Sequence, residues 1–127
     1  MKLNQIFDSY WEFRLKSDPT FATYIGDHRY DDKLPDYSEA AYLADLDTLK
    51  NYLVQSEKIN PNDLSETDRV SLLIFQKIIR DGLEGAKFKS YVFPISQQNG
   101  PHIDFPQLIS YHPFKTQLDY QNYITRL

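Results

Sequence analysis

The chain has 127 residues, a length typical of one domain, and its 41% hydrophobic and 25% charged residues exclude a low-complexity or collagen-like chain. It contains no cysteine, which excludes a disulfide scaffold, a thiolate zinc site and a cysteine nucleophile. Its 14 basic and 18 acidic residues give a net charge of −4, so we expect no nucleic-acid partner. We find no signal-peptide pattern, and the densest apolar run, Leu72 to Phe75, is too short to cross a membrane. We therefore expect no membrane association and a cytoplasmic location.

The first part of the chain carries apolar residues at helical spacing. The pattern predicts a helix from Leu3 to Lys16, and a second, short helix from Pro19 to Ile25 that Gly26 closes. Arg14 projects into the apolar arc of the first helix. It either pairs with an aspartate of the following loop or extends its head to water along an apolar stem.

A polar loop from Asp27 to Tyr37 follows, in which Arg29 stands among three carboxylates. A calcium site would need alternating oxygen ligands and a later bidentate acid, which this spacing lacks. We favour an arginine whose two-pronged head binds one or two of the aspartates and holds the loop.

The longest predicted helices form the middle of the chain. Ser38 caps a helix that runs to about Gln55, and Ser65 begins another that runs to about Phe88. The apolar residues of this later helix form two stripes: Leu72, Phe75, Ile79, Leu83 and Ala86 on one side, and Val70, Ile74 and Ile78 nearly opposite. Together they span about 200°, roughly twice what a one-sided surface helix needs. We expect this helix to be central in its domain, or covered by chain that this sequence does not supply.

Residues 90–114 are rich in proline and aromatic rings, which predicts an ordered loop region. Within it we expect a short helix near residues 105–110, with Asp104 as its N-cap and Pro106 in its first turn. Thr116 then starts a last helix, from Gln117 to Leu127. The fold class that follows is all-α, an irregular bundle of about four to six helices with one loop region at 90–114.

Histidine is the scarcest reactive side chain, present only as His28, His102 and His112 in three separate loops. A catalytic zinc usually takes three ligands, often closely spaced as in His-Glu-x-x-His, and no such motif occurs. We expect no metal site within this chain, and expect each histidine to donate to a nearby carbonyl or carboxylate. The polar stretch from Gln97 to Asp104 is either a binding surface or a set of side chains that satisfy irregular backbone.

A series of short motifs along nearly the whole chain resembles the opening part of the domain-of-unknown-function 885 family. The motifs are Tyr10-Trp11, Asp18-Pro19, Ala22 to Asp27, Arg29 to Asp32, Leu34 to Asp36, Asp68-Arg69, Leu83 to Gly85, Phe93 to Ile95, Gln98, Gly100 to Asp104, Pro106 to Leu108, His112 to Phe114, Asp119-Tyr120 and Tyr123. The resemblance implies a predominantly helical protein, similar to zinc metallopeptidases, whose metal-binding helix lies far downstream of the matched part. Zinc is thus implied for full-length relatives, but no ligand or catalytic glutamate is carried over to this chain.

The resemblance therefore implies a single helical segment, residues 1–127, that forms the N-terminal part of a larger helical domain. We expect it to be non-catalytic, to wall or cover a substrate cleft, and to pair with a missing C-terminal catalytic portion or a partner chain; full-length relatives would bind peptide. The candidate residues, which line that cleft or only brace loops, are His28, Arg29, Asp31, Gln98, His102, Asp104 and His112. The alternatives are a free-standing interaction module and a degenerate fragment that scarcely folds.

Overall fold

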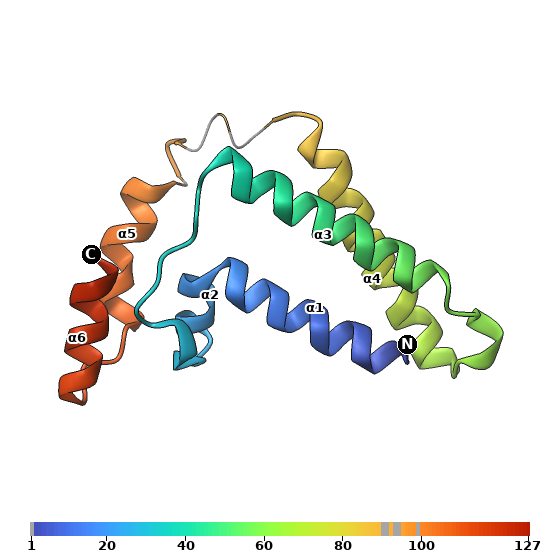
Figure 1. Cartoon of the computed structure of the whole chain (residues 1–127), viewed down its shortest axis with the longest axis horizontal. Coiled ribbons are helices and arrows are strands. Elements are labelled where there is room, and N and C mark those ends of the chain that lie inside the picture. The colour runs from blue at the N-terminus through green and yellow to red at the C-terminus, as the bar shows by residue number, and fades with distance from the viewer. Residues whose placement is uncertain (1, 90–91, 93–94, 99) are drawn as a thin grey trace. The chain divides into compact units, whose positions relative to one another are not determined.

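The computed structural model describes residues 2–89, 92, 95–98 and 100–127. Its elements, drawn in Figure 1, are the helices α1 (Leu3–Ser17), α2 (Pro19–Tyr24), α3 (Glu39–Glu57), α4 (Glu66–Ala86), α5 (Pro101–Tyr111) and α6 (Gln117–Arg126), with short 3-10 turns at His28–Tyr30 and Pro61–Asp63. The described residues contain no strand, and the predicted all-α fold is confirmed. None of the described helices is long and apolar enough to cross a membrane.

The helix starts follow from side chains that accept the first free backbone N–H groups. The Ser38 hydroxyl accepts from the N–H of Ala41 at 3.2 Å, and the Ser65 hydroxyl accepts from the N–H of Asp68 at 3.1 Å. At the start of α6, Thr116 and Asp119 cap each other reciprocally. The predicted starts at Ser38, Ser65 and Thr116 are therefore confirmed.

The prediction for α5 was wrong about its start and its cap. The helix begins at Pro101, behind Gly100, whose φ of 137° is a conformation that side chains rarely adopt. Asp104 lies inside the first turn, and Pro106 lies in the helix interior. Pro101 already occupies the first helical position, where a missing N–H costs nothing, so the helix starts about one turn earlier than expected. Much of the predicted loop region is consequently helical, and residues 90–91, 93–94 and 99 lie outside the described part.

The chain divides into two compact units. Unit 1 comprises Met1–Glu12 and Ser38–Val92, and unit 2 comprises Phe13–Tyr37 and Phe93–Leu127. Each of them is assembled from segments that are far apart in the sequence.

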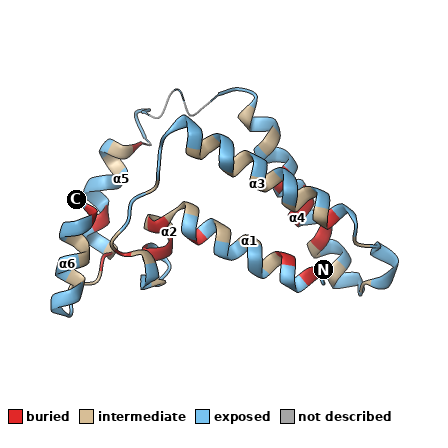
Figure 2. Ribbon diagram, in the orientation of Figure 1, coloured by how far each residue is buried: buried red, intermediate tan, exposed pale blue. Residues whose placement is uncertain are grey.

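The core of unit 1 forms where α1 and α3 meet α4. Ile6, Phe75 and Ile79 are buried there, surrounded by partly buried Phe7, Tyr10, Leu49, Tyr52, Leu53, Ile59 and Leu83. The Tyr10 ring meets the Phe75 ring edge-on at 5.1 Å between centroids. The buried positions on α4 are red in Figure 2. Aromatic packing thus fixes α1 and α3 on one face of α4.

The second apolar stripe of α4 has a different environment. Leu72 and Ile79 are at most 2% exposed, whereas Val70, Ile74 and Ile78 on the other side are at least half exposed. Leu73 beside them is 59% exposed. The wide apolar arc predicted from the sequence is real, but the described residues cover only one side of it.

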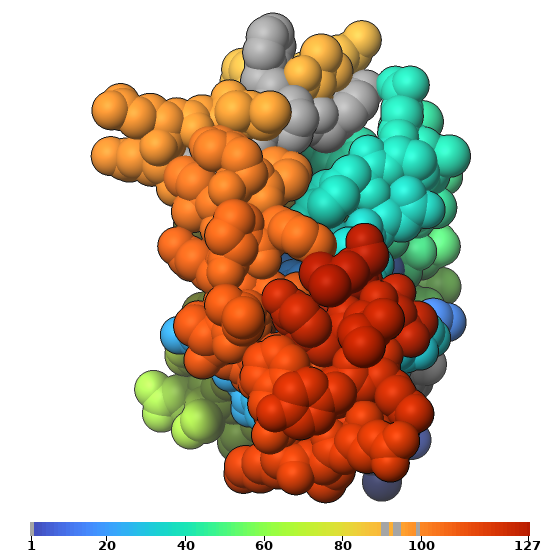
Figure 3. All heavy atoms as spheres, turned by 90° about the vertical axis from the view of Figure 1, so that its left-hand side faces the viewer, coloured from blue at the N-terminus to red at the C-terminus, as the bar shows by residue number. Residues whose placement is uncertain are grey.

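Unit 2 contains α2, α5, α6 and the loop that precedes α3. The spheres of α5 (orange) and α6 (red) lie side by side in Figure 3. Phe114 packs against the Tyr123 ring of α6 at 5.0 Å, and Tyr24 meets Tyr111 edge-on at 5.5 Å. Arg14 is exposed, with its guanidinium carbon 6.0 Å from the centre of the Phe21 ring, so its head extends toward solvent as in the second of the two interpretations.

Candidate functional site

Unit 2 is organised around the buried guanidinium of Arg126, which is only 3% exposed. It donates to backbone oxygens, those of Lys33 at 2.7 Å, Tyr30 at 2.8 Å and Pro19 at 3.3 Å. It also donates to the Thr23 hydroxyl at 2.7 Å. One side chain near the end of α6 therefore ties down the start of α2 and the loop that follows α2.

Asp31 supplies negative charge to the same cluster. Its carboxylate, 2% exposed, accepts from the Thr23 hydroxyl at 2.7 Å and from Nδ1 of His28 at 2.9 Å. Burial lowers the pKa of Arg126, and the charge of Asp31 opposes that shift. The guanidinium stays charged because its ordinary pKa is so high, and Thr23 links the two opposite charges through its hydroxyl.

His112 adds a neutral acceptor to the cluster. Its Nε2 lies 2.9 Å from the backbone oxygen of Asp119, which can only accept, so Nε2 carries the proton. Nδ1 is then free to accept from the Arg126 guanidinium at 3.4 Å. The expectation that histidines donate to nearby carbonyls and carboxylates is confirmed for His28 and His112.

Arg29 binds an aspartate of its own loop through two nitrogens, as predicted from the sequence. Its Nε and its terminal nitrogen both donate to the Asp27 carboxylate, the shorter contact being 2.6 Å. The pair is exposed, so it is a surface ion pair that contributes little to stability. Arg29, His28, Asp31 and His112 thus brace the loop and its surroundings.

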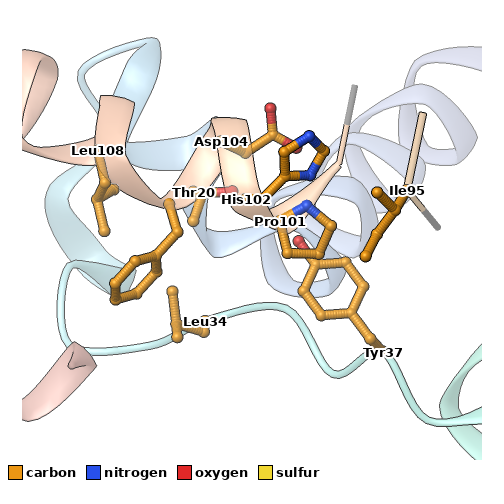
Figure 4. A pocket seen from close by; sticks show the side chains of 9 residues that line it. Thr20, Leu34, Tyr37, Ile95, Pro101, His102, Asp104 and Leu108 are labelled. Carbon is orange, nitrogen blue, oxygen red and sulfur yellow. The ribbon is translucent and has the colours of Figure 1, made fainter. Parts of the chain in front are cut away.

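A pocket of about 480 Å³ opens on unit 2. Its lining comes from α2, from the loop before α3, from the segment before α5 and from α5 itself. The lining residues are Thr20, Leu34, Tyr37, Ile95, Pro101, His102, Asp104, Phe105 and Leu108. Nearly all the surface that faces the pocket is apolar. Figure 4 shows Leu34 and Tyr37 reaching from the loop before α3 toward the α5 residues, with the Asp104 carboxylate beside the His102 ring.

The pKa values of two tyrosines at or near this pocket, Tyr37 and Tyr111, are raised. Burial raises the pKa of Tyr37 above 10.0, and the charges of Asp18 and Asp104 raise it further. Burial also raises the pKa of Tyr111, where Arg126 opposes the shift and the same two aspartates add to it. Both hydroxyls are therefore neutral at pH 7.

The structure brings together only part of the residue set predicted from the sequence. His102 and Asp104 line the pocket, His28, Asp31 and His112 belong to the Arg126 cluster, and Gln98 is exposed with its N–H 3.3 Å from the Ser96 hydroxyl. Arg126 was not predicted from the sequence, and neither were the other pocket residues, Thr20, Leu34, Tyr37, Ile95, Pro101, Phe105 and Leu108. No local signal marked Arg126, because α6 also carries Gln117, Asp119, Gln121, Asn122 and Thr125, and one further polar residue in such a helix does not call for a distant partner.

No group of three histidine, aspartate or glutamate side chains in the described part of the chain is placed to hold a metal ion. His28 and His112 already use ring nitrogens in hydrogen bonds. The zinc implied for longer relatives therefore does not fit the described residues.

Comparison with known proteins identifies the family. A family model described as a bacterial protein of unknown function (DUF885) matches residues 19–127. The chain belongs to the DUF885 family. The matched stretch contains the whole pocket and every residue of the Arg126 cluster. A search of curated proteins and a search of solved structures each returned no match.

Proposed function

We propose that this chain is a non-catalytic helical part of a metallopeptidase-like protein of the DUF885 family, in which unit 2 forms a wall of the substrate cleft. The observation that carries the proposal is the pocket on unit 2, because it gathers His102 and Asp104 with an apolar lining on the rigid helix α5. The Arg126 cluster supports it by fixing the loop that supplies Leu34 to the lining. Catalytic residues and zinc would come from outside these residues.

Two measurements test this proposal. The purified chain should contain no stoichiometric zinc and should hydrolyse no peptide, and zinc at one equivalent with turnover would overturn the non-catalytic assignment. The coding DNA read past codon 127 should continue in frame to a His-Glu-x-x-His motif. A stop codon directly after codon 127 would overturn the assignment to a longer peptidase.

The exposed stripe on α4 favours a second candidate, a helical interaction module. Val70, Ile74 and Ile78 recur every four residues with Leu73 beside them, a spacing that an apolar stripe of a partner helix would match. The partner would be an amphipathic helix of another chain, laid along α4.

Sedimentation distinguishes the cleft wall from the interaction module. The protein is purified together with any chain that stays bound to it, and the mass of the sedimenting species is measured. A stable hetero-complex that Ile74→Lys abolishes would support the module. Leu43→Lys on α3 is the matched control, because Leu43 is equally exposed but lies on another helix. A well-folded monomer that Ile74→Lys leaves unchanged would contradict the module.

A further inference from the structure

The pocket on unit 2 has the size and lining of a site for a flat apolar group. Its volume of about 480 Å³ lies within the range of roughly 300–1,000 Å³ that is usual for ligand pockets. A cavity of about 150 Å³ already holds a benzene ring, so a two-ring group such as indole fits with room for its attachment. Size alone therefore admits an aromatic side chain together with part of the backbone that carries it.

The lining favours rings over alkyl chains. Tyr37 and Phe105 present aromatic rings, and His102 and Pro101 add flat faces. Aromatic pairs in edge-on or offset contact gain about 0.5–1.5 kcal/mol beyond the area that they bury. Leu108 of α5, which is 1% exposed, belongs to the apolar lining. In Figure 4 Leu108 and Ile95 stand at opposite ends of the pocket.

The charges around the pocket restrict what the ring is attached to. Asp104 is the one carboxylate among the described lining residues, and Figure 4 shows it beside the His102 ring. Arg126 is not among the described lining residues, and none of those residues is an arginine or a lysine. His102 is the remaining titratable side chain in the lining. An anionic ligand is thus repelled, whereas a neutral or cationic one is not.

We infer that this pocket binds an aromatic side chain of a peptide, in a neutral or cationic context, and rejects ligands whose carboxylate lies next to the ring. The site takes an internal or N-terminal aromatic residue rather than a fatty acid or a C-terminal aromatic residue. This inference deepens the proposed cleft wall and rests on it for its biological meaning, although the binding itself is a property of the chain alone.

The test is a titration of the ¹⁵N-labelled chain, followed by its amide shifts, with four probes. The probes are N-acetyltryptophanamide (neutral), tryptophanamide (cationic), N-acetyltryptophan (anionic) and N-acetylleucinamide (neutral, no ring). We expect the first two to shift the amides of Leu34, Tyr37 and Leu108, and the anionic probe to bind at least about threefold more weakly. We expect the leucine probe also to bind at least about threefold more weakly than its tryptophan counterpart.

Two pairs of variants locate the binding. Leu34→Trp fills the pocket and should weaken binding of N-acetyltryptophanamide at least about tenfold. Leu118→Trp is its matched control, because Leu118 is 61% exposed on α6 and outside the pocket lining, and it should change nothing. Asp104→Asn should reduce the difference in affinity between the neutral probe N-acetyltryptophanamide and the anionic probe N-acetyltryptophan. Asp8→Asn, on α1, should leave this difference unchanged.

Each contrary outcome overturns the inference in a different respect. Absence of shifts at Leu34, Tyr37 and Leu108, or equal losses in both tryptophan variants, removes the site. Equal affinity for the leucine probe removes the ring preference, and equal affinity for N-acetyltryptophan removes the charge selection. Zinc-dependent turnover by the chain would remove the proposed non-catalytic role without affecting this titration, so the two failures are distinguishable.

Discussion

The Arg126 cluster allows a sharp prediction about stability. In Arg126→Met the apolar stem and the helix are kept, but the guanidinium is lost. Three backbone oxygens and the Thr23 hydroxyl then lose a charged donor inside unit 2, and buried Asp31 loses the nearby positive charge.

The magnitude follows from what the buried groups lose. A hydrogen bond to a charged group contributes about 1.5–3 kcal/mol, and such contributions within one network do not add. Removing one partner of a buried charged network costs about 3–5 kcal/mol, because the remaining groups cannot recover their hydration. We expect Arg126→Met to lower the free energy of unfolding by about 3–5 kcal/mol. Arg126→Lys keeps the charge but not the planar fork, so it should lose about 1–3 kcal/mol.

The free energy of unfolding is measured by denaturation in guanidinium chloride, followed by circular dichroism. Hydrogen exchange of the α2 and α6 amides then shows whether the stability is lost in unit 2. Arg29→Met is the matched control in the same unit. Its guanidinium also makes a bidentate pair, with Asp27, but that pair is exposed and should contribute less than about 1 kcal/mol. A loss below about 1 kcal/mol in Arg126→Met, or an equal loss in Arg29→Met, would refute the reasoning.

Three further predictions follow from single residues. The backbone N–H of Thr116 is the main cause that lowers the pKa of Asp119 below its ordinary value of 3.8. Because the pKa is lower in the folded chain than in the unfolded chain, the ionised carboxylate stabilises α6 above pH 3.8. This stabilisation is lost as the pH falls through the folded-state pKa. The melting temperature of Asp119→Asn should therefore lie below that of the wild type at neutral pH, and the gap should close in acid. Ile79→Ala should cost about 2–5 kcal/mol in chemical denaturation, whereas its exposed neighbour, in Ile78→Ala, should cost no more than about 0.5 kcal/mol. Gly82→Ala, in the interior of α4 with open space for a methyl group, should stabilise the chain by about 0.5–1 kcal/mol. Gly26→Ala, at a φ of +90°, should instead destabilise it by about 1–2 kcal/mol, and the denaturation midpoints of the two variants should move in opposite directions.

The sequence determined the helices wherever their signals are local. Ser38, Ser65 and Thr116 cap the helices that they were predicted to cap, because a capping side chain needs only a backbone N–H two or three residues away. Periodicity likewise identified the buried stripe of α4, since helical spacing fixes which side chains share a face. The start of α5 was the exception: the first-turn proline was taken to be Pro106, whereas the helix begins five residues earlier, at Pro101.

The site depended on contacts that no local rule describes. Arg126 meets Lys33, Tyr30 and Thr23 across about a hundred residues of sequence, so spacing gave no hint of the cluster. The pocket likewise joins Thr20, Leu34 and Tyr37 to side chains of α5.

His102 and Asp104 could be singled out as polar groups in a proline-stiffened segment, but an apolar pocket is a property of a surface rather than of a motif. Local hydrogen bonding and periodicity therefore set the elements of this protein. Tertiary packing decided which of its charges are buried and where a pocket opens, because both depend on which distant side chains exclude water together.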